Sequence, residues 1–182
     1  KGIIALTGYE GVLGYRTDEV YRTKEASRVT EYQQKFFDEH PDFDEAAWQK
    51  EVDDATNVAN TMKAEGWEFA SHTWGHIAPQ TVGLEAMQKD TQRWLDNVAS
   101  VVGDTDVIIF AFGADIGDWQ PYTDANPFFT YLKGKGFDIF CNVDSTQYWV
   151  QFGSNYMRQG RRNLDGYRMY YNPDMLSDLF DV

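Results

Sequence analysis

His72 and His76, two of the three histidines in this chain, lie four residues apart in the run Ser71-His72-Thr73-Trp74-Gly75-His76. Side chains at this spacing reach one side of a helical turn, and neutral imidazole is the commonest ligand for zinc and related metals. The spacing therefore predicts that His72 and His76 bind a divalent metal ion. The alternative at this spacing is a pair of solvated or hydrogen-bonded histidines without a metal.

One class of metalloenzyme is disfavoured by the residue that follows the first histidine. Metallopeptidases of the His-Glu-x-x-His type carry their general base directly after the first histidine. This chain has Thr73 at that position, and threonine is no general base. We therefore expect a different kind of metal site.

Three motifs, taken in order along the chain, carry a resemblance to a known family: His72 to His76, Phe112-Gly113, and Val143-Asp144 followed by Trp149. They resemble the His-Ser/Thr-x-x-His, Pro-Tyr/Phe-Gly and Asp-x-x-Asp-Trp motifs of the polysaccharide deacetylase (NodB-homology) family, carbohydrate esterase family 4. The runs from Leu6 to Thr17 and from Arg158 to Arg168 look like signatures of an atypical branch. The resemblance implies a bacterial hydrolase, secreted or associated with the cell envelope, that removes acetyl groups from a polysaccharide or a peptidoglycan-like glycan.

The resemblance also implies roles for single residues. His72 and His76 would bind Zn²⁺, with Co²⁺, Ni²⁺ or Mn²⁺ as alternatives, Asp144 would support a charged neighbour of the catalytic base, and Trp149 would form a wall of the pocket. The ordinary alternatives are a turn residue for Asp144 and a packed or surface aromatic for Trp149.

Two motif residues of the family have no counterpart at their usual places. The arginine of the third motif is replaced by Ile109 and Ala111 at the positions before Phe112. The candidates to substitute for it are Arg16, Arg158, Arg161 and Arg162, of which we expect Arg161; the alternative is that nothing substitutes and that these arginines are solvated at the surface. No histidine occurs after His76, so Asp165 is the nearest candidate for the general acid. A carboxyl group could donate a proton there only if burial raised its pKa, and a turn residue before Gly166 is the alternative.

Aromatic and glycine-flanked residues near the predicted site are candidates for substrate binding. Tyr9 and Glu10 lie in a loop that contains Gly8, Gly11 and Gly14, directly after a predicted strand. Trp74 lies between the two histidines. We expect Tyr9, Glu10, Trp74 and Trp149 to contact the glycan, since aromatic rings stack on sugars; an exposed turn residue and core packing are the alternatives.

The first motif of the family, an aspartate pair that supplies the general base and a metal ligand, is not visible in this sequence. The chain opens within the strand-like run Lys1 to Thr7. We therefore expect residues 1–182 to form a single deacetylase-like domain that is truncated at its N-terminus, with the base on an upstream segment. The alternative function is that of a catalytically impaired relative that binds carbohydrate.

Composition excludes several other classes. The net charge is −13, with 16 Lys and Arg against 29 Asp and Glu, which argues against a nucleic-acid partner. No run approaches the ~20 apolar residues of a membrane span. Cys141 is the only cysteine, so no intramolecular disulfide forms, and its apolar surroundings predict a buried thiol.

Hydrophobic periodicity predicts alternating strands and helices. Asp44 is expected to cap a helix that ends at Gly66, and Leu84 to Val101 repeat at helical spacing. Strands are expected at 3–7, 67–71, 107–110 and 139–143, a short helix at 127–135, and surface helix and loop at 17–43. Such alternation predicts an α/β fold with parallel strands. The resemblance implies the distorted (β/α) barrel of the NodB type, incomplete at the N-terminus.

Overall fold

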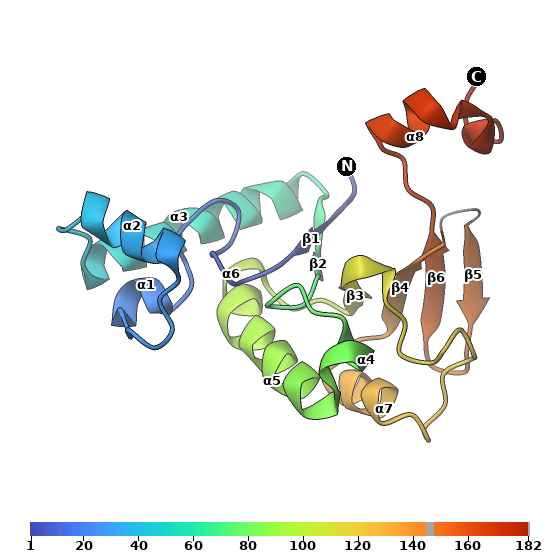
Figure 1. Ribbon diagram of the computed structural model, residues 1–182, viewed down its shortest axis with the longest axis horizontal. Coiled ribbons are helices and arrows are strands. Elements are labelled where there is room, and N and C mark those ends of the chain that lie inside the picture. The colour runs from blue at the N-terminus through green and yellow to red at the C-terminus, as the bar shows by residue number, and fades with distance from the viewer. Residues whose placement is uncertain (145–147, 182) are drawn as a thin grey trace.

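The computed structural model of the protein describes residues 1–144 and 148–181. Its α-helices and strands alternate over most of the chain (Figure 1). In chain order they are β1 (Ile3–Leu6), α1 (Val20–Thr23), α2 (Glu31–Glu39), α3 (Glu45–Ala64), β2 (Glu68–Ser71), α4 (Pro79–Val82), α5 (Leu84–Trp94), α6 (Ser100–Val102), β3 (Val107–Ile109), α7 (Pro127–Gly134), β4 (Ile139–Val143), β5 (Trp149–Phe152), β6 (Met157–Arg161) and α8 (Gly166–Tyr171). A π-helical turn, Leu95–Ala99, joins α5 to α6, and 3₁₀ turns occupy Ala111–Gly113 and Pro173–Leu176.

The strands form one six-stranded sheet in the order β1-β2-β3-β4-β6-β5. All neighbouring pairs are parallel except β5 and β6, which are antiparallel. Because parallel strands need crossovers, helices join β1 to β2, β2 to β3 and β3 to β4. The predicted α/β class is confirmed.

Two clusters of apolar side chains join the helices to one face of the sheet. Met87 of α5 and Phe129 of α7 pack with Ile108 and Phe140 of the central strands. The second cluster packs Ala55 and Ala59 of α3 with Phe69 of β2 and with the buried side chains of Trp94 and Val98. The segment that carries α8 leaves the sheet and lies apart from these helices (Figure 1).

The opposite face of the sheet buries a smaller cluster. Ala70, Val107, Ile109 and Cys141 come from β2, β3 and β4, in alternation with the residues that face the helices. Burial raises the pKa of the Cys141 thiol, which agrees with the predicted core position.

The predicted bounds of several elements agree closely with those in the structure. Asp44 accepts a hydrogen bond from the backbone N–H of Ala47 and caps α3, and β4 spans the predicted residues Ile139–Val143. The resemblance to the third motif predicts that Phe112-Gly113 ends a strand, and this placement was wrong. β3 ends at Ile109, and both residues lie in a 3₁₀ turn in which Phe112 has a positive φ of 57°.

The expectation of a mostly exposed segment at 17–43 was wrong in part. Thr17, Asp18, Val20 and Tyr21 are buried. The ring of Tyr21 makes edge contacts with three phenylalanines, at centroid distances of 5.3 Å to Phe36, 5.7 Å to Phe37 and 6.4 Å to Phe43. Spacing within this segment is irregular, so periodicity did not reveal this small aromatic core.

Candidate functional site

The carboxyl ends of the parallel strands lie along one edge of the sheet and place the predicted site residues there. Leu6 pairs with Ser71, Ile109 with Cys141, and Val143 with Arg161. His72 follows β2 directly, and its backbone N–H donates to the carbonyl of Leu6 at 2.9 Å. This edge is where α/β proteins usually bind their ligands.

The imidazole of His72 is oriented by β3. Its Nδ1 lies 2.6 Å from the carbonyl oxygen of Ile109, which requires a proton on Nδ1 and leaves Nε2 with its lone pair free to bind a metal. A histidine that ligates a metal almost always makes such a bond with its other nitrogen. Burial lowers the pKa of His72, and the nearby His76 and Arg161 act in the same direction, so the neutral ring is favoured.

The ring of His76 lies beside that of His72, with centroids 4.9 Å apart and planes at 63°. The other neighbour of His76 is Phe112, whose ring centroid is 4.5 Å away. The spacing predicts that the two histidines share a helical turn, but they do not. Thr73 and His76 have positive φ values of 62° and 53°, so an irregular turn brings the rings together.

Asp90 of α5 holds this turn in place. Its carboxylate accepts hydrogen bonds from the backbone N–H groups of Trp74 at 2.8 Å and Gly75 at 2.7 Å. Within the turn, the hydroxyl of Thr73 accepts from the N–H of Ile77 at 2.8 Å. Burial raises the pKa of the Asp90 carboxyl, and the two backbone donors act against this rise.

Replacing Asp90 with alanine should lower the free energy of unfolding by about 2 kcal/mol, because two backbone donors lose a charged acceptor. Urea unfolding measures this change. Asp96→Ala is the matched control, since exposed Asp96 accepts only from the Gln92 side chain among the described residues; we expect it to stay within about 0.5 kcal/mol of the parent. Equal effects in the two variants would contradict an anchoring role for Asp90.

Arg161 and Asp144 lie at the ends of β6 and β4. The Nε of Arg161 donates to the carbonyl of Asn142 at 3.1 Å, and the N–H of Asp144 donates to the carbonyl of Arg161 at 2.8 Å. Burial lowers the pKa of the Arg161 guanidinium. Because the charge of Arg161 also acts on His72, the structure brings the predicted arginine near the histidine pair.

The four residues expected to bind substrate fall in different places. The rings of Tyr9 and Trp74 meet edge to face at 6.5 Å, so these two lie together beside the histidine turn. Glu10 accepts a hydrogen bond from the hydroxyl of Tyr21 at 2.9 Å, which ties it to the aromatic core of the 17–43 segment. Trp149 begins β5, and its indole lies 6.5 Å from that of Trp119.

Asp165, the candidate general acid, caps α8. Its carboxylate accepts a hydrogen bond from the backbone N–H of Arg168 at 2.7 Å, and the residue is exposed. This is the turn role that the sequence offered as the alternative. A general acid needs a raised pKa and a place beside the scissile bond, whereas Asp165 is an exposed helix cap.

A buried polar network lies beside the site, and the sequence did not reveal how its members pair. Arg158 of β6 and Asp115 form an ion pair at 2.8 Å, with side chains 1% and 4% exposed. The carboxylate of Asp115 also accepts from the Tyr122 hydroxyl at 2.5 Å and from the Asn142 amide at 3.2 Å. Arg158 donates to the carbonyl of Gln120 at 2.7 Å. These bonds fix the loop that follows Phe112.

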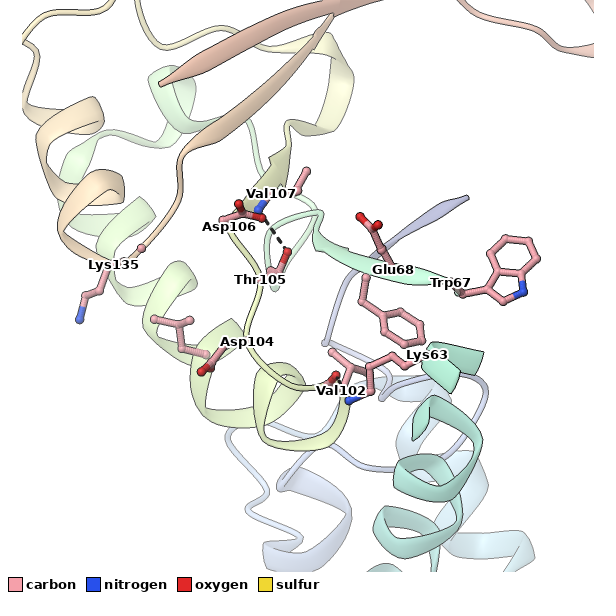
Figure 2. A pocket seen from close by; sticks show the side chains of 12 residues that line it. Lys63, Trp67, Glu68, Val102, Asp104, Thr105, Asp106, Val107 and Lys135 are labelled. Carbon is pink, nitrogen blue, oxygen red and sulfur yellow. Dashed lines mark hydrogen bonds between the residues drawn. The ribbon is translucent and has the colours of Figure 1, made fainter. Parts of the chain in front are cut away.

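A cavity separate from this edge lies at the other end of the sheet (Figure 2). It measures about 740 Å³ and opens between the start of β2 and the start of β3. Charged side chains of both signs line it, among them Lys63, Glu68, Asp104, Asp106 and Lys135. Because the histidines follow the carboxyl end of β2, this cavity at the amino ends is separate from the candidate site.

The histidine pair fits part of a metal site. Two imidazoles with adjacent rings, one of them oriented through Nδ1, are suitable zinc ligands. Within residues 1–144 and 148–181, no group of three or more His, Cys, Asp and Glu could hold a metal ion. These residues therefore account for two ligands of a site that needs more.

Fold and site define an α/β protein with a histidine pair at the carboxyl edge of a mainly parallel sheet. Residues 45–122 match the family model described as Polysaccharide deacetylase, a range that runs from α3 through both histidines to Tyr122. This match supports the polysaccharide deacetylase family, and the resemblance predicted from the motifs is confirmed. No curated protein and no solved structure gave a match.

Proposed function

We propose that the protein hydrolyses acetyl groups on an acetylated polysaccharide, with His72 and His76 as ligands of a divalent metal ion. The observation that carries the proposal is the family match over residues 45–122, which includes both histidines. The oriented imidazole of His72 supports it. A bound Zn²⁺, or Co²⁺, Ni²⁺ or Mn²⁺ in its place, would polarise the acetyl carbonyl and lower the pKa of a water molecule.

The remaining parts of the site are assigned as follows. Arg161 supplies positive charge close to the histidine pair, and Asp144 lies next to it at the strand ends. Within the described residues, no group of three or more His, Cys, Asp and Glu could hold a metal ion, so the general base and the third metal ligand are left unassigned. The substrate is an acetylated polysaccharide or a peptidoglycan-like acetylated glycan, a class implied by the family.

We further propose that the sheet closes into a distorted barrel. Helices cover the face that carries Phe69, Ile108 and Phe140. The opposite face buries the small or medium side chains Ala70 and Cys141, which suit the interior of a small barrel.

In the described part of the chain, no helix is both long and apolar enough to cross a bilayer.

Acetate release tests this function. The protein that contains residues 1–182 is incubated with an N-acetylglucosamine oligomer, and acetate is measured with zinc present and after chelation. We expect release that requires the metal and that His76→Ala abolishes. No release from N-acetylated or O-acetylated glycans, in a protein shown to bind zinc, would contradict deacetylation.

A second candidate function is carbohydrate binding without catalysis. Phe112 and Trp119 are 75% and 54% exposed and are held at positive φ values of 57° and 65°. Non-glycine residues in this region of backbone space cluster at functional sites. Glycan binding without acetate release, with unchanged binding after chelation, would favour this candidate over the deacetylase.

A further inference from the structure

A second, smaller cavity lies beside the histidine turn. It measures about 300 Å³, which is the lower end of the size range of ligand pockets. Its walls come from the loop after β1, from α2 and α5, and from the turn between the two histidines. The lining residues used below are Tyr9, Asp18, Arg28, Gln33, Trp74 and Arg93.

The two oxygens of the buried Asp18 carboxylate differ in their hydrogen bonds. The side chain is almost fully buried, with the residue 1% exposed. Its Oδ1 accepts a hydrogen bond from the backbone N–H of Val20 at 3.0 Å, whereas the buried Oδ2 has no partner among the described residues. A buried acceptor of this kind destabilises the fold unless something bonds to it.

Trp74 presents the complementary donor. Its buried Nε1 likewise has no hydrogen-bond partner within the described part of the chain. The indole approaches the Asp18 carboxylate closely enough for a long, weak hydrogen bond, which lowers the pKa of that carboxyl against the larger rise that burial causes. The cavity is therefore lined by an acceptor and a donor that lie near each other and that form no hydrogen bond of normal geometry within the described residues.

The other side chains that line the cavity either have partners within the protein or are aromatic. The guanidinium of Arg93 stacks on the Trp74 ring, 3.4 Å from its centroid, and Arg28 is paired with Glu19. Gln33 donates to the carbonyl of Tyr9 at 3.3 Å. The ring of Tyr9, which is 44% exposed, forms the rim against the edge of Trp74.

These groups select the chemistry of a ligand. A carboxylate would face the carboxylate of Asp18, and an ammonium group could not accept from the indole N–H and would face Arg93. A hydroxyl group both donates and accepts, so it can bond to Oδ2 of Asp18 and to Nε1 of Trp74 at once. An aromatic rim suits the apolar face of a sugar ring.

We propose that this cavity binds one neutral sugar unit, through a hydroxyl that bridges Asp18 and Trp74, as a subsite next to the histidine pair. Trp74 belongs to the turn that carries His72 and His76, so a glycan held here has a neighbouring unit close to the two imidazoles. The choice of sugar as ligand rests on the proposed function. Occupation of the cavity itself needs neither the metal nor catalysis.

Nuclear magnetic resonance of the indole N–H groups tests the subsite directly. The chain has 6 tryptophans, and Trp74→Phe identifies the cross-peak of Trp74 in ¹⁵N-labelled protein. The metal-free protein is titrated with N-acetylglucosamine through the millimolar range. We expect the Trp74 cross-peak to shift saturably and more than the other five. A cross-peak that stays in place, or that moves only with sodium acetate, overturns the proposal.

Asp18→Asn is the diagnostic variant. Asparagine keeps an oxygen for the N–H of Val20, but it offers an NH₂ donor where the ligand hydroxyl needs an acceptor. We expect the sugar affinity to fall at least tenfold. Asp106→Asn, an exposed aspartate in the larger cavity, should bind like the parent. Unchanged sugar affinity in Asp18→Asn would mean that no ligand hydroxyl bridges Asp18 and Trp74.

The stability of Asp18→Asn distinguishes a lost contact from a lost fold. Burial raises the pKa of Asp18 in the folded protein above its ordinary value of 3.8, so ionisation opposes folding at neutral pH. The variant should therefore melt at a temperature no lower than the parent at pH 7, and any gain should shrink as the pH falls toward 4. A variant that is folded and yet fails to bind sugar supports the subsite, whether or not acetate release is observed.

Discussion

Replacing Arg158 with methionine is expected to lower the free energy of unfolding by about 3–5 kcal/mol, the usual cost of leaving one member of a buried ion pair alone. Asp115 would keep its charge at a position where its side chain is 4% exposed. Asn142 and the carbonyl of Gln120 would each lose a donor as well. Urea unfolding, followed by tryptophan fluorescence and by circular dichroism, measures the loss.

A double-mutant cycle separates the charge from the packing. In Arg158→Met with Asp115→Asn, no buried charge remains and the Tyr122 hydroxyl still has an oxygen acceptor, so we expect part of the stability to return. Lys89→Met is the control, because its partner Glu85 and the lysine are 81% and 74% exposed. That variant should change stability by less than about 1 kcal/mol. A loss this small in Arg158→Met would show that the pair is unimportant.

The ion pair has a functional consequence because of where it lies. The guanidinium of Arg158 is 5.2 Å from the ring centroid of Trp149 and 5.8 Å from that of Trp119. Asp115 accepts from the backbone N–H of Trp119 at 2.5 Å. The pair therefore holds two aromatic residues that lie beside the carboxyl edge of the sheet, and its loss should weaken glycan binding as well as folding.

Elements with a strong local pattern could be predicted from the sequence. The apolar residues Trp48, Val52, Ala55, Ala59 and Met62 repeat at helical spacing between the Asp44 cap and Gly66, and they define α3 without help from the rest of the fold. The run Ile139–Val143 is apolar enough to define β4. In both cases the information lies within a single segment.

β6 could not be recognised in the same way. Its residues Met157–Arg161 are mostly polar and resemble a surface loop. The strand buries Arg158 and Gly160 because it pairs with β4, and the charge of Arg158 is matched by Asp115 from a distant loop. Only the alternation of Tyr156, Arg158 and Gly160 on the buried side hinted at a strand.

In the candidate site, too, some features could be predicted from the local sequence and others depend on distant residues. The histidine pair could be recognised from the sequence because the two residues lie four apart, although an irregular turn and not a helical one brings their rings together. Its orientation is not local: Ile109 of β3 fixes the ring of His72, and Asp90 of α5 fixes the turn. Arg161 was selected from several arginines without a structural reason, and the pairing of β6 with β4 brings it near His72.

Zinc affinity should fall by more than about 100-fold in His72→Ala and in His76→Ala, since loss of a ligand should cost at least as much as loss of its orienting partner. The two imidazoles are adjacent and the described residues offer no larger ligand group, so each ring carries a large share of the binding. Competition with a chromophoric chelator measures the affinity. Circular dichroism shows whether each variant keeps its fold.

His40 provides the matched control for these two variants. It is the third histidine of the chain, is exposed, and ends α2 with its ring 4.5 Å from that of Phe36. His40→Ala removes an imidazole far along the chain from the histidine turn, so its zinc affinity should equal that of the parent. Equal affinity in all three variants would mean that any bound zinc lies elsewhere, and the histidine turn would then owe its geometry to Asp90 and Ile109 alone.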